Sequence, residues 1–192
     1  KQLEIDRRRV REKITRLKND LESVRQHRFT QRKRRQRTEV PVVAIIGYTN
    51  AGKSTLMNAI TRAGVFVEDK LFATLDPTTR KVTLPNRRQF FLTDTVGFIH
   101  KLPHTLVEAF KATLEEVVDA DLLVHVTDAS NPNVEAQMQA VHEVLKEIGA
   151  DDRPMLYVLN KMDLVQEGNG RGMPRALEGA IPISAKDGTG IP

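Results

Sequence analysis

The sequence predicts an α/β fold, with a doubly wound, mostly parallel sheet preceded by a long basic helix. From residue 39 onward, short apolar runs rich in β-branched residues alternate with amphipathic helical patterns, as in a parallel sheet covered by helices. Residues 1–38 contain neither Gly nor Pro and carry a net charge of +10, whereas residues 39–192 carry a net charge of −5. We therefore expect a basic heptad helix at 1–38 and a separate domain at 39–192.

Composition excludes several classes of protein. The chain has no cysteine, which excludes a disulfide scaffold, a Cys-based zinc site and a thiol nucleophile. It has no apolar run of about 18 residues, so no membrane span is predicted. It begins at Lys1 within a charged stretch, which is not a secretory signal and suggests a fragment of a longer protein.

The basic segment carries a heptad stripe of apolar residues at Val10, Ile14, Leu17, Leu21 and Val24. The spacing predicts one helix from about residue 2 to the low thirties. A single apolar stripe needs a partner, either from upstream sequence or from a second copy of the chain. Arg7 interrupts the stripe, which weakens the interpretation as a coiled-coil dimer.

Beyond Val24 the stripe gives way to a cluster of positive charge at Arg28, Arg32, Lys33, Arg34, Arg35 and Arg37. Such a cluster can neutralise phosphates in a salt-dependent way. It can equally be a solvated helix end beside a linker. Phe29 is the only interleaved aromatic residue, so base stacking is not indicated.

The first motif of the domain follows an apolar run at 42–46 that predicts a buried parallel strand. G-x-x-x-x-G-K-S stands between this strand and a helical segment, which is the context of a phosphate-binding loop. Lys53 is expected to reach the β- and γ-phosphates, and Ser54 to ligate Mg²⁺. The residues expected at the phosphates are Gly47, Tyr48, Thr49, Asn50, Ala51, Gly52, Lys53, Ser54 and Thr55.

The second motif ends a pair of predicted strands at 80–84 and 89–93. A carboxylate at a strand end beside the phosphate loop, here Asp94, is the acidic partner of Mg²⁺ in this class, behind the first shell of ligands. Gly97 can bring its backbone N–H close to the γ-phosphate. The residues of this motif are Asp94, Thr95, Val96 and Gly97.

Two further motifs predict a site for guanine, and therefore for GTP or GDP. After predicted strands at 122–127 and 155–159, separated by a helix at 133–148, come Asn160, Lys161, Met162 and Asp163. Asp163 can accept from the guanine N1–H and exocyclic amine, whereas adenine would leave a buried Asp163 unpaired. We expect Asn160 to tie this loop to the phosphate loop, and Lys161 to cover the base. After a strand at 181–183, backbone N–H groups would meet the guanine carbonyl oxygen at Ser184, Ala185 and Lys186.

The ordered motifs GYTNAGKS, DTVG, NKMD and SAK resemble the translation-factor-related branch of P-loop GTPases, and more narrowly the HflX family of ribosome-associated GTPases. The narrower resemblance covers GYTNAGKSTLMNAIT, LFATLDPTTRKVTLP and LTDTVGFIHKLPHTLVEAFKATLEE. The basic heptad helix resembles the second helix of that family's helical region. By this resemblance, the family's N-terminal domain, the first helix of that pair and the final helix of the GTPase domain lie outside this chain. Absence of that last helix should expose apolar sheet surface.

The resemblance implies a cytoplasmic GTPase that binds the large ribosomal subunit and its RNA, through the basic helix and the upstream domain. Nucleotide-controlled subunit dissociation, rescue of stalled ribosomes and a monomeric full-length protein follow from it. It also assigns switch I to Phe72, Ala73, Thr74, Leu75 and Asp76. Thr74 would complete the Mg²⁺ shell, with Thr78 and Thr79 as rivals on composition alone. Lys53, Thr74 and Gly97 are then the candidate catalytic residues.

The catalytic water has no evident partner. Phe98 stands where Ras-like GTPases carry a water-orienting Gln, so we expect slow intrinsic hydrolysis that a partner accelerates. His100 and His104 lie nearby but fit exposed loop histidines better, and His125 in a core strand fits a structural role. Asn50 resembles the asparagine with which some GTPases hold K⁺, although Asn also suits a tight turn.

Two other functions remain open. One is a nucleotide-gated RNA-binding module without useful hydrolysis in isolation. The other is an ATPase or small-molecule kinase, because a phosphate loop alone does not choose the base. Asn160 and Asp163 argue against the latter.

Overall fold

The computed structural model describes residues 9–16, 19–20, 23, 40–61, 77–98, 114–165 and 179–191. The chain forms two compact units, Lys1–Val40 and Pro41–Pro192. In the first unit, residues 9–16, 19–20 and 23 are helical, and Val10 and Ile14 are 57% and 47% exposed. Within the described residues, no helix has the length and apolar character needed to cross a membrane.

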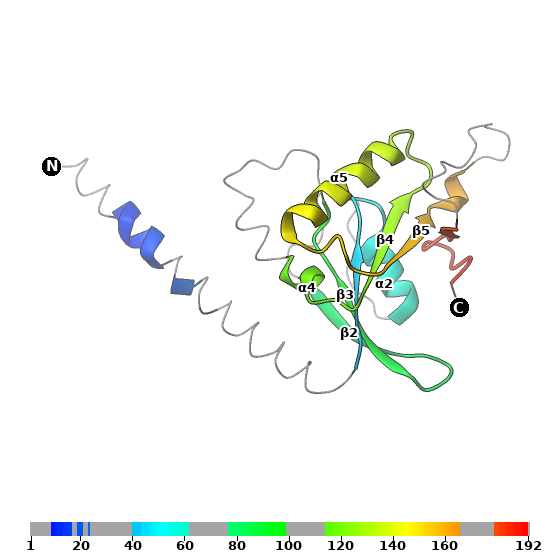
Figure 1. Ribbon diagram of the computed structural model, residues 1–192, viewed down its shortest axis with the longest axis horizontal. Coiled ribbons are helices and arrows are strands. Elements are labelled where there is room, and N and C mark those ends of the chain that lie inside the picture. The colour runs from blue at the N-terminus through cyan, green and yellow to red at the C-terminus, as the bar shows by residue number, and fades with distance from the viewer. Residues whose placement is uncertain are drawn as a thin grey trace. The chain divides into compact units, whose positions relative to one another are not determined.

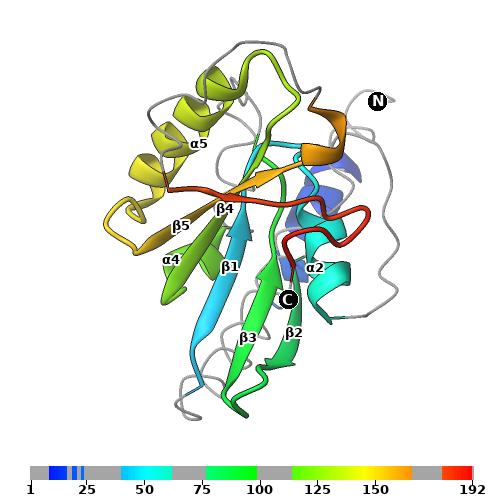
Figure 2. The same ribbon diagram turned by 90° about the vertical axis from the view of Figure 1, so that its right-hand side faces the viewer.

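A six-stranded sheet forms the centre of the second unit, in the order β2-β3-β1-β4-β5-β6 (Figures 1 and 2). All neighbouring strands pair in parallel except β2 and β3, which form an antiparallel hairpin. The predicted α/β fold with a mostly parallel sheet is confirmed. The strands are β1 (Val42–Ile46), β2 (Thr78–Thr83), β3 (Gln89–Asp94), β4 (Leu122–Asp128), β5 (Met155–Asn160) and β6 (Ile181–Pro182).

Helices cover the two faces of this sheet. α2 (Lys53–Thr61) lies on one face, and α5 (Val134–Ile148) lies on the other together with α4 (Glu115–Val118) (Figure 2). Each face buries its own apolar cluster, one built around Ile46, Leu123 and Leu145, the other around Ile45, Met57 and Val126. This burial on both sides explains why the central strands are continuous apolar runs rather than alternating ones.

The topology separates the sheet into two functional ends. β1, β3, β4 and β5 all end at the same edge, where the phosphate loop and the D-T-x-G and N-K-x-D motifs follow them. The turn of the β2–β3 hairpin, residues 84–88, lies at the other end of the sheet. In Figures 1 and 2 this hairpin continues past the helices as a two-stranded ribbon.

The β5–β6 edge exposes apolar side chains. Leu156 and Ile181 are both exposed there, although strands of this kind are usually covered. This edge therefore presents apolar side chains to solvent.

Candidate functional site: a phosphate loop joined to a base-reading loop

Lys53 is the most deeply buried charge in the phosphate loop. It is the first residue of α2 and only 6% exposed. Its ammonium Nζ donates to the carbonyl oxygens of Tyr48, at 3.0 Å, and Gly47, at 3.2 Å. The loop thus wraps around the amine and holds it at the carboxyl end of β1.

Burial has an electrostatic cost at this lysine. Desolvation lowers the pKa of Lys53 from its ordinary value of 10.5 to about 8, against the opposing effect of the Asp94 carboxylate. A desolvated cation with a single carboxylate for compensation attracts further negative charge. Phosphate oxygens are ligands of the required charge and size.

Ser54 and Asp94 bring two oxygen donors together from different elements. The Ser54 hydroxyl, on the first turn of α2, donates to Asp94 Oδ2 at the end of β3 over 2.5 Å. Hydroxyl and carboxylate oxygens are donors that suit Mg²⁺, which usually takes only one or two protein ligands and completes its shell with water and phosphate. The residues present therefore fit a magnesium site of this class.

Two glycines are required by close approach. A Cβ at Gly97 would lie 2.7 Å from the Cα of Thr49 and 2.9 Å from Lys53 Nζ. Gly52 has a φ of 92°, and a Cβ there would lie 2.2 Å from Asn160 Nδ2. The first contact presses the D-T-x-G segment against the phosphate loop, and the second presses the N-K-x-D loop against it.

Phe98 attaches the D-T-x-G segment to the phosphate loop through its backbone. Its N–H donates to Gly47 O, at 3.1 Å, and its carbonyl accepts from Thr49 N–H, at 2.8 Å. The side chain is fully buried, at 0% exposure, in the apolar cluster beneath α4 and α5. The aromatic ring is therefore a core residue and presents no group to a reacting water.

Asn160, at the end of β5, joins three loops with one buried amide. Its Nδ2 donates to Ala51 O in the phosphate loop over 2.9 Å, and its Oδ1 accepts from Ala185 N–H over 2.9 Å. The asparagine makes the link to the phosphate loop that the sequence suggested. It also holds the S-A-K segment in place, which the sequence did not suggest.

Two details differ from the sequence-based expectation. Asp163 was expected to be buried but is exposed, because it lies in a 3-10 turn (Met162–Leu164) beyond the end of β5. Its Oδ1 accepts from the Ser184 hydroxyl over 2.8 Å. Of the three backbone N–H groups expected to face the guanine carbonyl, that of Ser184 donates to Thr189 O and that of Ala185 donates to Asn160 Oδ1. None of the hydrogen bonds among described residues uses the N–H of Lys186.

Asp128 is a site residue that the sequence analysis missed. It ends β4, and its Oδ2 lies 2.8 Å from Lys161 Nζ in a largely buried ion pair. Its Oδ1 accepts from the N–H and hydroxyl of Ser130. Lys161 itself has a left-handed backbone with φ 64°, so the ion pair holds the side chain of a residue in a sparsely populated conformation. The signal available in the sequence was a carboxylate at a strand end, beside the strand that carries N-K-x-D.

Two threonines have structural partners. The Thr95 hydroxyl, expected near the nucleotide, donates instead to Ile45 O over 2.7 Å and is fully buried. The Thr79 hydroxyl, a rival for the switch I role, pairs with the Thr93 hydroxyl across the β2–β3 hairpin at 2.9 Å. Ala51 and Val96 are buried, and Tyr48 is half-buried. Asn50 has φ 61°, a conformation that asparagine tolerates well in turns.

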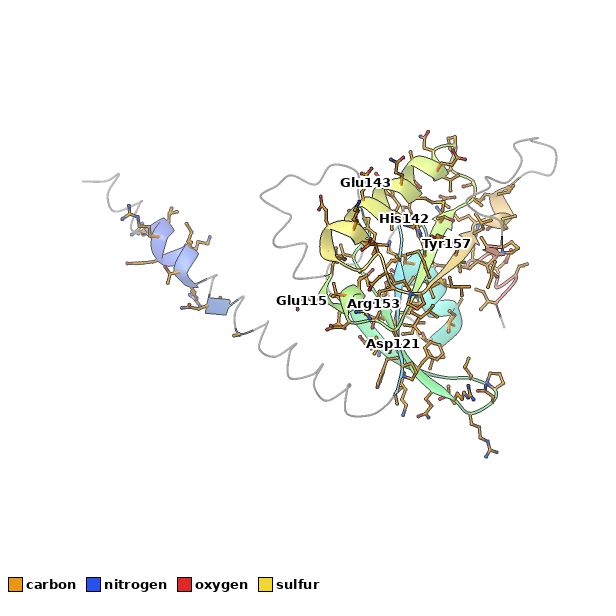
Figure 3. All side chains as sticks on the ribbon, in the orientation of Figure 1. Glu115, Asp121, His142, Glu143, Arg153 and Tyr157 are labelled. Atoms are coloured by element: carbon orange, nitrogen blue, oxygen red, sulfur yellow. The ribbon has the colours of Figure 1, made fainter. Side chains whose placement is uncertain are left out.

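His125 lies in the core against two other rings. It is 1% exposed in β4, with ring centroids 5.6 Å from His142 of α5 and 5.5 Å from Tyr157 of β5. His142 Nε2 and the Tyr157 hydroxyl are 3.2 Å apart (Figure 3). Neither ring nitrogen of His125 has a hydrogen-bond partner among the residues that the structure describes. Burial, with smaller effects of His142 and Lys53, lowers the pKa of His125 to about 3.

This depressed pKa predicts acid sensitivity. Well above pH 6.5, His125 is neutral in both the folded and the unfolded chain. As the pH falls towards 3, the unfolded chain binds a proton on this residue that the folded chain does not bind, so the free energy of unfolding decreases across this window. Between pH 7 and pH 5 the loss from this group is about 2 kcal/mol. Urea titrations at the two pH values should show the loss in wild type and its absence in His125→Leu. An equal loss in both proteins would contradict the assignment.

Several predicted residues lie outside the described part of the chain. They include the switch I candidates Phe72, Ala73, Thr74, Leu75 and Asp76, the nearby histidines His100 and His104, and the basic cluster at 28–37.

Known proteins match this chain in sequence and in fold. Residues 42–161 match the model of a family described as 50S ribosome-binding GTPase. The chain belongs to this family. The matched residues include the phosphate loop, Asp94, Gly97 and Asn160, which the structure gathers at one end of the sheet.

Within this GTPase family, the resemblance to HflX is confirmed. Proteins named GTPase HflX from Caldanaerobacter subterraneus and Escherichia coli are 53% and 47% identical to this chain, over 98% and 100% of its residues. These matches cover 43% and 45% of the relatives, so the chain spans less than half of their length.

Solved GTP-binding proteins share the fold. A GTP-binding protein from Sulfolobus solfataricus in complex with GDP superposes with a TM-score of 0.56 at 30% identity, covering 81% of this chain and 50% of that one. A variant of Aquifex aeolicus Era bound to GDP.AlF4− gives a TM-score of 0.59 at 28% identity, covering 78% and 52%.

Proposed function

We propose that this chain binds GTP with Mg²⁺, hydrolyses it to GDP and phosphate, and acts as a nucleotide-controlled switch on the large ribosomal subunit. The observation that carries the proposal is the Asn160 amide, which joins Ala51 of the phosphate loop to Ala185 of the S-A-K segment. A ligand that fills both loops must carry a base and phosphates at a fixed separation, as a nucleoside triphosphate does.

Guanine is the base that this site favours. The Asp163 carboxylate accepts from Ser184 through one oxygen, which leaves acceptor capacity for the N1–H and the amine of guanine. The Lys186 N–H is available for the guanine carbonyl, and Lys161 is held by Asp128 where its stem can cover the base. Adenine presents the opposite donor pattern at these positions, so ATP is the disfavoured ligand.

The phosphate end provides charge without a base catalyst. Lys53 neutralises the β- and γ-phosphates, Ser54 holds Mg²⁺, Asp94 orients its shell, and Thr74 is our candidate for the switch I ligand. When bound, Mg²⁺ neutralises charge that develops on the phosphate oxygens. Gly97 places its N–H at the γ-phosphate. Because the Phe98 ring lies in the core, this chain offers no side chain at that position to orient water, and we propose slow intrinsic hydrolysis that the ribosome stimulates.

The finer roles extend this proposal. Splitting of ribosomal subunits, rescue of stalled ribosomes and a contact of the basic cluster at 28–37 with ribosomal RNA are what the family resemblance supports. Asn50 is a candidate ligand for K⁺, although its left-handed turn explains an asparagine there without a cation. Turnover that is unchanged when Na⁺ replaces K⁺ would remove this candidate.

The switch is tested by sedimentation of the chain with purified large subunits in GTP, in a non-hydrolysable GTP analogue and in GDP. The proposal predicts binding with the triphosphate and release with GDP. Equal binding in all three states, with no turnover, would favour the alternative of an RNA-binding module whose hydrolysis serves no purpose in isolation. Tight ATP binding would favour a kinase or ATPase.

The Asp128–Lys161 ion pair predicts a loss of nucleotide affinity. Asp128→Asn keeps the shape and the acceptor for Ser130 but removes the charge that holds Lys161, so GTP and GDP affinity should fall about tenfold, with dissociation accelerated. Release of a fluorescent GDP in stopped flow measures this. Asp121→Asn is the matched control, because the Asp121 carboxylate accepts from Val42 N–H at the start of β1 instead. This variant should leave the rate of GDP release unchanged. Equal release rates in all three proteins would contradict a role for Asp128.

A further inference from the structure

The β2–β3 hairpin carries a concentration of positive charge that the nucleotide site does not use. Arg80 and Lys81 in β2, and Arg87 and Arg88 in the turn, are all exposed. Residues 77–93 include no acidic residue, although the sequence from 39 to 192 has a net charge of −5. None of the four side chains forms an ion pair with another residue of the described part.

The turn holds one of these arginines in a strained conformation. Leu84 O accepts from Arg87 N–H and Arg88 O accepts from Leu84 N–H, while Asn86 Oδ1 accepts from Arg88 N–H. Arg87 itself has φ 65°, the left-handed position of the turn, which usually takes Gly or Asn. An arginine there is disfavoured by the backbone, so the fold does not explain its presence.

Protection of the sheet edge does not explain these residues either. Charged side chains on an edge strand hinder pairing with other chains, and this would account for Arg80 and Lys81 on β2. Arg87 and Arg88 lie beyond the ends of both strands, since β2 ends at Thr83 and β3 begins at Gln89. Arg87 and Arg88 therefore place positive charge at the tip of the hairpin, where a binding partner would contact it.

We infer that this hairpin is a second RNA-docking element, which contacts the phosphate backbone of a helical RNA segment. Residues 83–89 are all exposed and include no aromatic side chain, so phosphate contact rather than base stacking fits the tip. Successive residues of a strand point to opposite faces, so Arg80 and Lys81 place charge on both sides of the ribbon. Double-stranded RNA is recognised largely by such shape and phosphate contacts.

The position of the hairpin makes this contact independent of the nucleotide. The turn and Asp94 lie at opposite ends of β3, six residues or roughly 20 Å apart. The inference rests on the proposed ribosomal function for the identity of the RNA, but not for the contact itself.

The test measures the affinity of the full chain for a 20-base-pair RNA duplex and for purified large subunits over a range of KCl concentrations. The variants are Arg87→Gly, Arg88→Gln and their combination. Lys146→Gln, an exposed residue of α5, is the control with the same loss of charge per site. The double variant should bind about tenfold more weakly and show a salt dependence shallower by about two, whereas Lys146→Gln should stay within about twofold of wild type.

Arg87→Gly separates recognition from structure. Because glycine relieves the left-handed strain, this variant should melt about 2 °C higher than wild type while it binds RNA more weakly. If Arg87 had only a structural role, its replacement would make the protein less stable. Unchanged affinity and salt dependence in the double variant would overturn the inference, as would weaker binding to subunits without weaker binding to the duplex, which would indicate a ribosomal protein as partner.

The two proposals fail separately in this design. Binding of the RNA duplex requires no nucleotide. Subunit binding that does not depend on GTP would therefore contradict the proposed nucleotide switch, but it would not contradict the proposed RNA contact of the hairpin. Hairpin variants that keep GTP-dependent subunit binding and wild-type salt dependence would contradict only the hairpin.

Discussion

Lys53→Met should weaken GTP binding strongly and yet leave the empty chain more stable than wild type. The ammonium is buried, and its pKa is lowered from 10.5 to about 8, which corresponds to a cost of about 3 kcal/mol in the empty protein. Methionine avoids this cost but gives up two hydrogen bonds to Gly47 and Tyr48, each worth about 1 kcal/mol. We expect a net gain of about 1 kcal/mol and a loss of GTP affinity of at least about a hundredfold.

The predicted gain in stability of Lys53→Met can be checked through the pH dependence of the free energy of unfolding. Between pH 8 and 10.5 the unfolded wild-type chain holds a proton on Lys53 that the folded chain has released, so the free energy of unfolding contributed by this group rises with pH. The variant should lack this rise. Urea titrations at pH 7.5 and 9.5, with calorimetry for GTP, make the measurement. A variant that is less stable than wild type at pH 7.5 would contradict the account of a costly buried cation.

Asp163→Asn should change which base is bound. The amide presents a donor where guanine also presents donors, so GTP affinity should fall by about a hundredfold or more. Xanthine carries a carbonyl in place of the guanine amine, and its triphosphate should become the better ligand. The Ser184 hydroxyl can still donate to the Asn oxygen, so the loop should keep its conformation.

Competition between GTP, xanthosine triphosphate and ATP for a fluorescent nucleotide measures this change. Asp187→Asn is the matched control, because it removes a carboxylate just after the S-A-K segment, where Asp187 accepts from Thr189 N–H. The control should bind GTP as wild type does. Retention of GTP preference by Asp163→Asn would mean that the base lies elsewhere.

Local sequence patterns were sufficient to predict the sheet and the nucleotide-binding motifs. The apolar runs at 42–46 and 122–127 predicted strands because parallel strands buried on both faces cannot alternate. The motifs were predicted because strand ends gather at one edge, which sets Asp94, Asn160 and the phosphate loop side by side.

Contacts between residues that are distant in the sequence could not be predicted from local sequence patterns. Asp128 and Lys161 meet because β4 and β5 pair with Asp128 opposite Asn160, a register that neither strand specifies alone. Asp163 was expected to be buried by its motif, but the end of β5 leaves it at the surface. The left-handed Arg87 follows from a turn whose hydrogen bonds cross the hairpin.

We propose above all that this chain is a GTP-hydrolysing switch that the large ribosomal subunit controls. The most direct test is phosphate release from GTP with and without purified large subunits, with ATP in place of GTP as the specificity control and Lys53→Met as the blank. The account predicts slow release by the chain alone and a marked stimulation by subunits that is specific to GTP. Fast release by the chain alone, unchanged by subunits, would contradict it.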